Sequence, residues 1–106
     1  MATIKSHTGI KQSRRLAEIL PIESANMYYW CGEELRIGGY RAMDIDYDIP
    51  CWSLAALLNV LPSATLDSSD DHYYRVHCMG RYTEWYDNAI DACYEMILKL
   101  HELKNL

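Results

Sequence analysis

Three stretches of the chain, residues 10–20, 54–61 and 89–103, carry apolar side chains at the three- and four-residue spacing of an amphipathic helix. The first stretch ends at Pro21, because proline disfavours the helical conformation in the residue before it. The longest follows Asn88, which can cap a helix. The pattern therefore predicts three helices, one near each end of the chain and a short one in the middle.

The short middle helix has the clearest start in the sequence. Ser53 is a typical N-cap, and Trp52 before it can pack on Leu57 at the fourth helical position. Pro62 marks its end. For the first helix, the candidate N-cap is Thr8.

Two pairs of segments predict β-hairpins. Residues 27–31 are aromatic and precede residues 33–37 across a glycine, and residues 72–79 and 82–86 flank a Gly-Arg pair. A further extended segment is expected at residues 40–49, where apolar and acidic residues alternate with period two.

The polar residues 63–71 are expected to form a loop. The elements then follow the order α, β, β, α, β, β, α, counting the two hairpins and three helices. With 106 residues, 50% hydrophobic and 24% charged, we expect one α+β domain over residues 1–106. It would have an antiparallel sheet of about four strands, in two hairpins, with three helices packed mainly on one face.

Charge and hydropathy exclude several classes of protein. A net charge of −5 argues against a non-specific nucleic-acid binder, which needs an excess of Lys and Arg. The start of the chain has no apolar signal region, and no apolar run approaches the ~20 residues of a membrane span. We therefore expect a cytoplasmic protein whose four cysteines, none in a C-x-x-C pair, are reduced, each as a small buried hydrophobic residue. In a secreted protein they would allow two disulfides in three connectivities.

Three segments point to a family. They are DIPCWSLAALL at residues 48–58 followed by Leu61-Pro62, NAIDACYEMI at residues 88–97, and residues 12–21. Together, and in this order, they resemble small uncharacterised proteins of prophages and mobile elements from anaerobic gut bacteria. No activity is attached to that family, so the resemblance implies an origin and no mechanism. In the family the position of Cys51 is more often a small residue such as Ala, which argues against a nucleophile there.

Cys51 is nevertheless the most tempting catalytic residue, because it directly precedes a helix start that can lower a thiol pKa. His77 as base and Glu84 or Asp87 beyond it would complete the chain order of a minimal cysteine hydrolase. The alternative is that Cys51 fills a small pocket beside Trp52 while His77 is an exposed strand residue.

Metal and cofactor motifs are incomplete. Asp44, Asp46 and Asp48 imitate the start of a calcium loop, but Ile49 and Ala55 stand where glycine and glutamate are required. The nearby histidines and Cys78 cannot converge on zinc from neighbouring strand positions. No glycine-rich phosphate motif is present. The sequence therefore predicts no metal and no cofactor.

The aromatic composition is the remaining clue: nine Tyr and three Trp, but no Phe. Tyr, Trp and Arg are enriched at the energetic centres of protein interfaces. The candidate interface residues are Tyr28, Trp30, Tyr73, Arg75 and Trp85. The alternatives are a tyrosine-rich core or a small-ligand site. We expect an accessory protein of mobile-element origin that binds another protein, or a second copy of itself, through an aromatic and acidic surface.

Overall fold

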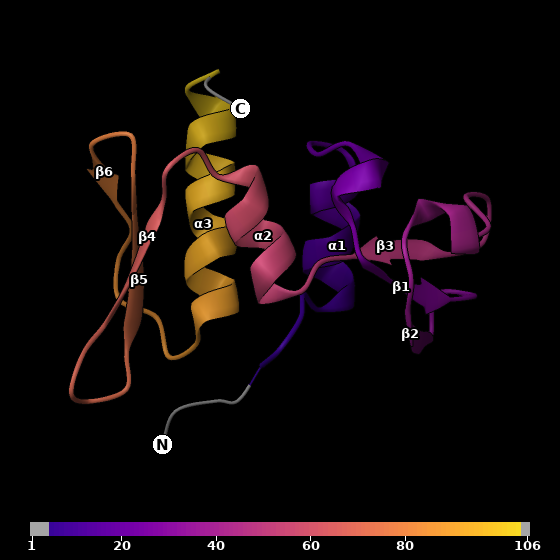
Figure 1. Ribbon diagram of the computed structural model, residues 1–106, viewed down its shortest axis with the longest axis horizontal. Coiled ribbons are helices and arrows are strands. Elements are labelled where there is room, and N and C mark those ends of the chain that lie inside the picture. The colour runs from indigo at the N-terminus through magenta and orange to yellow at the C-terminus, as the bar shows by residue number, and fades with distance from the viewer. Residues whose placement is uncertain (1–4, 105–106) are drawn as a thin grey trace.

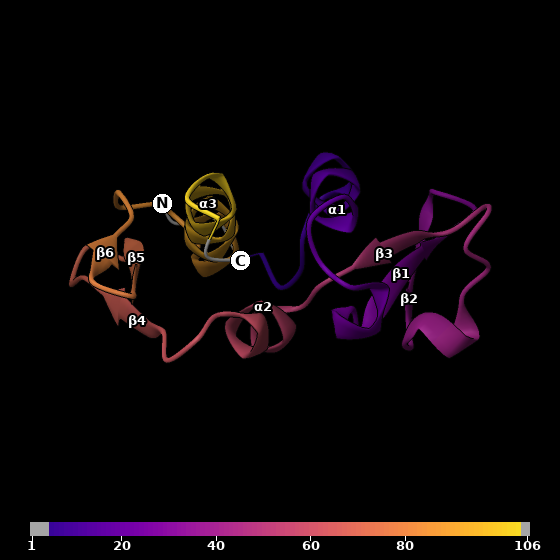
Figure 2. The same ribbon diagram turned by 90° about the horizontal axis from the view of Figure 1, so that it is seen from above.

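Two three-stranded antiparallel sheets stand at opposite ends of the molecule, and the helices lie between them (Figures 1 and 2). The computed structural model describes residues 5–104. The molecule measures 39 × 34 × 18 Å, so it is thin in one direction.

The N-terminal part contains α1 (Ile10–Ala17) and the first sheet, β1 (Met27–Trp30), β2 (Glu34–Ile37) and β3 (Ile49–Cys51). The strand order is β2-β1-β3, and α1 lies against β3. Two 3₁₀ turns, Ile22–Ser24 and Tyr40–Ala42, connect these elements.

The C-terminal part contains α2 (Leu54–Val60), α3 (Ala89–Glu102) and the second sheet. Its strands are β4 (Thr65–Ser68), β5 (Tyr74–Cys78) and β6 (Arg81–Tyr82), in the order β4-β5-β6. α3 covers the inner face of β5, and α2 packs on α3.

One cluster of buried side chains joins α1, α2, α3 and β5. Trp52, at the start of α2, is completely buried, and its indole N–H donates to the Ser24 hydroxyl at 2.9 Å. That bond satisfies a donor that would be costly to bury unpaired. The inner side of the second sheet contributes Val76 and Cys78, both essentially without exposure.

The helix predictions agree with the structure in number and approximate place. Ser53 Oγ accepts the N–H of Ala56 at 3.2 Å, and Asn88 Oδ1 accepts the N–H of Asp91 at 2.8 Å, so both predicted N-caps are confirmed. The prediction for Thr8 is wrong, because Gly9 occupies the N-cap of α1. The α+β class with three helices is confirmed as well.

The prediction of an extended strand at residues 40–49 is wrong. The segment forms the Tyr40–Ala42 turn and a second turn in which Asp48 Oδ2 accepts the N–H of Asp44 at 2.8 Å. Ile45 and Tyr47, expected on a buried face, are both 71% exposed. Aspartate side chains that bond the backbone locally favour turns over strands, which explains the difference.

The sheet prediction holds only roughly. Both predicted hairpins form, as β1–β2 and β5–β6, but residues 5–104 contain six strands in two sheets where about four in one sheet were expected. The predicted loop at residues 63–71 contains β4, which pairs with β5. β4 looks like a loop in the sequence because Thr65, Asp67 and Ser68 are polar and only Leu66 packs against the core. The helices lie between the sheets, with α3 packed on β5 of the second sheet and α1 on β3 of the first.

Candidate functional site

The solvent-facing side of the second sheet gathers aromatic and basic side chains. Along β5, Val76 and Cys78 are buried toward α3, so the alternating residues Arg75 and His77 project from the opposite face. In the β5–β6 register His77 is the partner of Tyr82. Sheet geometry therefore places side chains from both strands on one surface.

These side chains contact one another in a row. The guanidinium carbon of Arg75 lies 4.5 Å from the ring centre of Tyr82 and 4.6 Å from that of Trp85. The ring of His77 stacks on Tyr82, with centres 4.3 Å apart and planes 12° from parallel. Cation–π contacts of this kind favour the arrangement of exposed rings by about 0.5–1 kcal/mol each.

Arg75 is anchored from the neighbouring strand. Its Nε donates to Asp67 Oδ2 at 3.1 Å, and the two residues are partners in the β4–β5 register. The ion pair is more than one-third exposed, so its own contribution to stability is small. Its effect is to orient the guanidinium between β4 and the rings of Tyr82 and Trp85.

Tyr73 lies beside this row, directly before β5. Its backbone is fixed by Ser69, whose N–H donates to the Tyr73 carbonyl at 2.8 Å and whose hydroxyl accepts the Tyr73 N–H at 3.1 Å. A two-bond bridge between Tyr74 and Tyr86, each bond 2.7 Å long, holds the chain around Trp85 next to it. We call the five side chains Tyr73, Arg75, His77, Tyr82 and Trp85 the aromatic face.

The aromatic face is accessible. Tyr73, Tyr82 and Trp85 are 47%, 50% and 44% exposed. Within residues 5–104, neither phenol hydroxyl nor the Trp85 indole N–H has a hydrogen-bond partner. Tyr73 and Trp85, together with Ser69 and Asp71, line an open hollow of about 310 Å³. Large rings that are fixed in position and carry unused donors are suited to binding a partner.

The five residues that the sequence predicts as an interface do not lie on one surface. Tyr73, Arg75 and Trp85 come together, whereas Trp30 lies on the other sheet, 45% exposed, with the Arg36 guanidinium 4.3 Å from its ring. Tyr28 shares a face of β1 with Trp30 but is buried beneath the segment around Gly38. It is therefore not available for binding at the surface of this chain.

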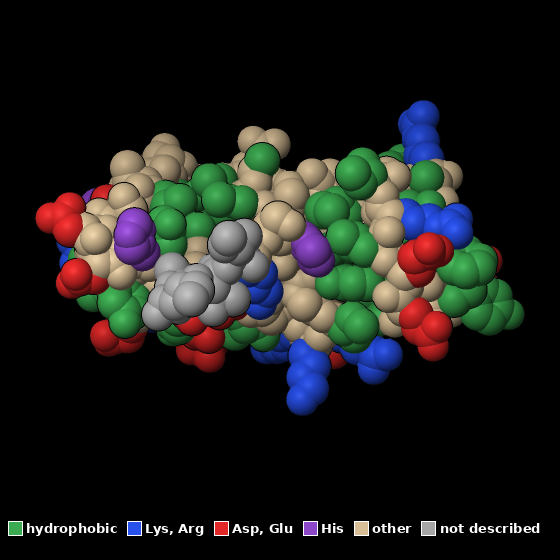
Figure 3. Space-filling view, turned by 90° about the horizontal axis from the view of Figure 1, so that it is seen from below, with side chains coloured by type: hydrophobic (Ala, Val, Ile, Leu, Met, Phe, Trp, Pro, Cys, Tyr) green, Lys and Arg blue, Asp and Glu red, His purple; other side chains and the backbone are tan. Residues whose placement is uncertain are grey.

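Hydrophobic side chains are also exposed near the first sheet, where charged groups surround them (Figure 3). They are Trp30, Ile37, Tyr40, Ile45 and Tyr47. They come from separate turns and strand ends, and apart from the contacts of Arg36 with Trp30 and Arg41 with Tyr40, they form no stacked row. The aromatic face is the more organised of the two surfaces.

His77 and Tyr82 belong to the site although sequence reasoning leaves them out of the interface. The signal for His77 is its position two residues after Arg75, which puts both on one face of a strand. The signal for Tyr82 is the turn between β5 and β6, whose central residues Met79 and Gly80 have φ of 52° and 77°. A two-residue turn fixes the pairing of His77 with Tyr82.

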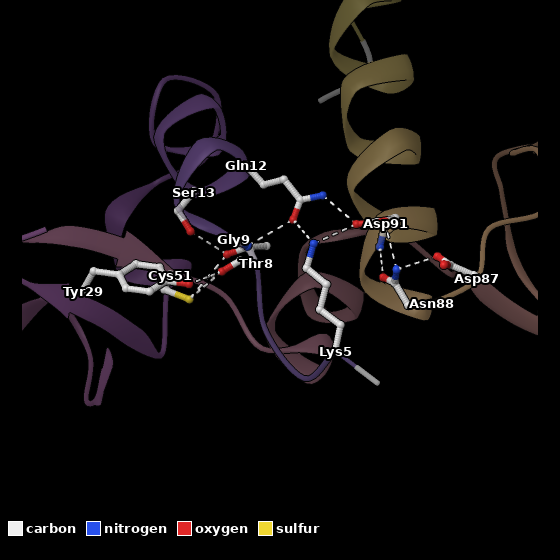
Figure 4. A network of polar contacts seen from close by, with 10 residues as sticks. All are labelled: Lys5, Thr8, Gly9, Gln12, Ser13, Tyr29, Cys51, Asp87, Asn88 and Asp91. Atoms are coloured by element: carbon white, nitrogen blue, oxygen red, sulfur yellow. Dashed lines mark hydrogen bonds and ion pairs between the residues drawn. The ribbon is translucent and has the colours of Figure 1, made fainter. Parts of the chain in front are cut away.

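The proposed hydrolase residues are not assembled. Cys51 is completely buried in β3, where its Sγ lies 3.4 Å from the Thr8 carbonyl and 3.5 Å from the Thr8 hydroxyl (Figure 4). His77 stands on the other sheet, stacked on Tyr82, and Glu84 is exposed beyond it. The thiol is therefore closed off from solvent, and His77 is not beside it to act as its base.

The polar groups around Cys51 are hydrogen-bonded to one another and hold the N-terminal segment against the first sheet. Tyr29 donates its hydroxyl to the Thr8 carbonyl at 2.7 Å, and the Thr8 hydroxyl contacts Ser13 at 2.7 Å. Burial, with a further contribution from Cys51, raises the pKa of Tyr29 to about 12. The phenol thus stays protonated and keeps this bond at physiological pH.

A second polar group in Figure 4 ties the N-terminal segment to α3. Lys5 Nζ lies 2.9 Å from Asp91 Oδ1, and the Gln12 amide donates to the same oxygen at 2.7 Å. Asn88 donates to the other oxygen at 2.8 Å. Partial burial alone would raise the pKa of Asp91, but the bonds from Lys5, Asn88 and Gln12 lower it.

The structure offers no metal centre among residues 5–104, where no three His, Cys, Asp or Glu side chains converge. Asp48 is occupied with the backbone N–H groups of Cys31 and Asp44, at 2.7 and 2.8 Å. The aspartates at residues 44–48 therefore organise a turn.

No family model, no curated protein and no solved structure matches this chain. The resemblance to small mobile-element proteins therefore stays a prediction. Over the part of the chain that the structure describes, no helix has both the length and the apolarity to cross a bilayer.

Proposed function

We propose that the protein is a protein-binding module whose contact surface is the aromatic face. The observation that carries the proposal is the row Trp85, Arg75, Tyr82 and His77, in which each side chain contacts the next on an exposed sheet face. Tyr73 extends the surface at one end. The partner in this proposal is another protein, and the place of binding is the cytoplasm, where the four unbridged thiols would be stable.

Two physical arguments favour a protein partner. First, the rings are already held by contacts and backbone bonds, so binding would cost little side-chain entropy. Second, Asp67 and Asp71 lie at the face, and the chain carries a net charge of −5, which disfavours a polyanionic nucleic acid. Tyr, Trp and Arg together are the residue types enriched at protein-binding hot spots.

The experiment is a selection from a random peptide library displayed on phage, with the immobilised wild-type protein as bait. We expect enriched peptides that bind the wild type and lose binding to W85A. The variant removes an exposed ring and leaves the buried face of the sheet intact, so near-UV and far-UV circular dichroism should show a folded protein.

The matched control is W30A, because Trp30 is equally exposed and also stacks with an arginine, but lies on the other sheet. The enriched peptides should bind W30A as well as the wild type. Failure to enrich any peptide, or enrichment of peptides that W85A still binds, would refute the proposal.

A further inference from the structure

The hollow between Tyr73 and Trp85 has a composition that narrows the class of partner. Two half-exposed aromatic side chains form its apolar walls, and Asp71 and Ser69 provide its polar rim. We infer that it binds a proline-rich segment in the polyproline II conformation that carries a basic residue beside the prolines. This inference rests on the protein-binding function proposed above.

Ring spacing is the first argument. Trp85 and Tyr82 both lie within 4.6 Å of one guanidinium carbon, so their centres are no farther apart than the ~9 Å rise of one polyproline II turn. One turn of such a helix is therefore long enough to span both rings. Proline is rigid, so a proline-rich segment loses little entropy on docking into an aromatic groove.

The unused donors are the second argument. The hydroxyls of Tyr73 and Tyr82 and the indole N–H of Trp85 have no partner within residues 5–104. A polyproline II helix makes no internal hydrogen bonds, so its carbonyl groups are available as acceptors. An α-helical partner would present carbonyls that are already bonded, and its side chains would have to satisfy these donors.

Charge is the third argument, and it explains why the partner segment should carry a basic residue beside its prolines. The carboxylate of Asp71 lines the hollow, and Asp70 precedes it in the same exposed turn. The guanidinium of the aromatic face, that of Arg75, is already paired with Asp67. The rim near Tyr73 and Trp85 is therefore left with a negative charge that an arginine or lysine of the partner would complement.

The test uses three synthetic peptides titrated into the full-length protein, with ¹⁵N–¹H NMR shifts as the readout. The probe is a decaproline peptide ending in two arginines. The first comparison peptide ends in two glutamates, and the second replaces the prolines with a glycine-serine repeat and keeps the arginines. We expect shifts centred on residues 69–86 with the first peptide, and about tenfold weaker binding with each of the others.

Variants locate the contacts. We expect Y73A and W85A each to weaken binding of the proline-arginine peptide by about tenfold or more, as for central hot-spot residues. D71N should weaken it by severalfold and should remove most of its dependence on salt. W30A is the matched control and should bind as the wild type does. Since D71N changes one exposed atom, it tests the inference even where a ring variant unfolds.

The outcomes separate this inference from the function on which it rests. If library peptides bind through Trp85 but the proline-arginine peptide does not bind, the partner class is refuted and the protein-binding function stands. Equal binding of the glutamate peptide would also refute the inference. Stronger shifts of the aromatic face with oligo-dT, or with rising protein concentration alone, would assign it to single-stranded nucleic acid or to a second copy of the chain.

Discussion

The ammonium group of Lys5 and the carboxylate of Asp91 lie 2.9 Å apart, although 86 residues separate them in the sequence. Gln12, at the start of α1, donates to the same carboxylate oxygen. Asp91 belongs to the first turn of α3, where the helix dipole favours a negative charge. One carboxylate thus joins the N-terminal segment, α1 and α3.

Replacement of this carboxylate by an amide should destabilise the protein. D91N keeps the size of the side chain but removes its charge from the helix start and from Lys5. Both partners are about 30% exposed, so we expect a loss of about 1 kcal/mol in the free energy of unfolding. Urea unfolding followed by circular dichroism measures it. The control D70N, in an exposed turn, should change stability by less than about 0.5 kcal/mol.

The same carboxylate predicts a pH dependence. The pKa of Asp91 in the folded protein is lower than its usual 3.8, so the ionised form is favoured by folding. The stability that ionised Asp91 contributes is fully present above pH 3.8. It is lost as the pH falls through the lower pKa of the folded protein. The stability difference between wild type and D91N should therefore be constant from pH 7 to about pH 5 and shrink below pH 3.8. A difference that grows on acidification would contradict the assignment.

The helices were predictable because their signals are local. The caps at Ser53 and Asn88 and the apolar spacing of α3 depend only on residues a few positions apart. The prediction of an extended segment at residues 40–49 failed because its structure depends on contacts with distant residues. Its alternation of apolar and acidic residues is equally compatible with a turn. Whether Asp48 bonds Cys31 and Asp44 or faces solvent on a strand depends on how β1 ends.

The candidate site was predictable in residue type but not in arrangement. The residue types of Tyr73, Arg75 and Trp85 make them candidate interface residues in the sequence. Their contact with Tyr82 depends on the β5–β6 register, and the burial of Tyr28 depends on a segment that folds over β1 from outside the strand. Both are tertiary relationships, which local patterns do not encode.

The cap of α3 should contribute measurably to stability. Asn88 is buried, accepts the N–H of Asp91 and donates to its carboxylate. N88A removes both bonds, and we expect a loss of about 1–2 kcal/mol in the free energy of unfolding, seen in urea. N59A is the matched control: Asn59 is exposed within α2, where alanine is the better helix former, so stability should be unchanged or slightly raised. Equal losses in the two variants would show that Asn88 is not a cap.

Thiol reactivity distinguishes structural from catalytic cysteines. Cys31 is exposed, whereas Cys51, Cys78 and Cys93 are buried, and burial raises the pKa of Cys93 to about 12. A buried protonated thiol does not react with an alkylating reagent. Iodoacetamide at pH 8 should therefore label the native protein at Cys31 alone, as mass spectrometry of the tryptic peptides would show.

The variant C31S supplies the control for this prediction. Native C31S should remain unlabelled over the time in which the wild type gains its single label, and its three remaining thiols should react completely in urea. Rapid labelling of Cys51 in native C31S would mean an accessible, activated thiol and would revive the hydrolase hypothesis. Slow labelling of all three buried thiols at one common rate would instead report global unfolding, because only unfolding of the whole domain exposes all three together.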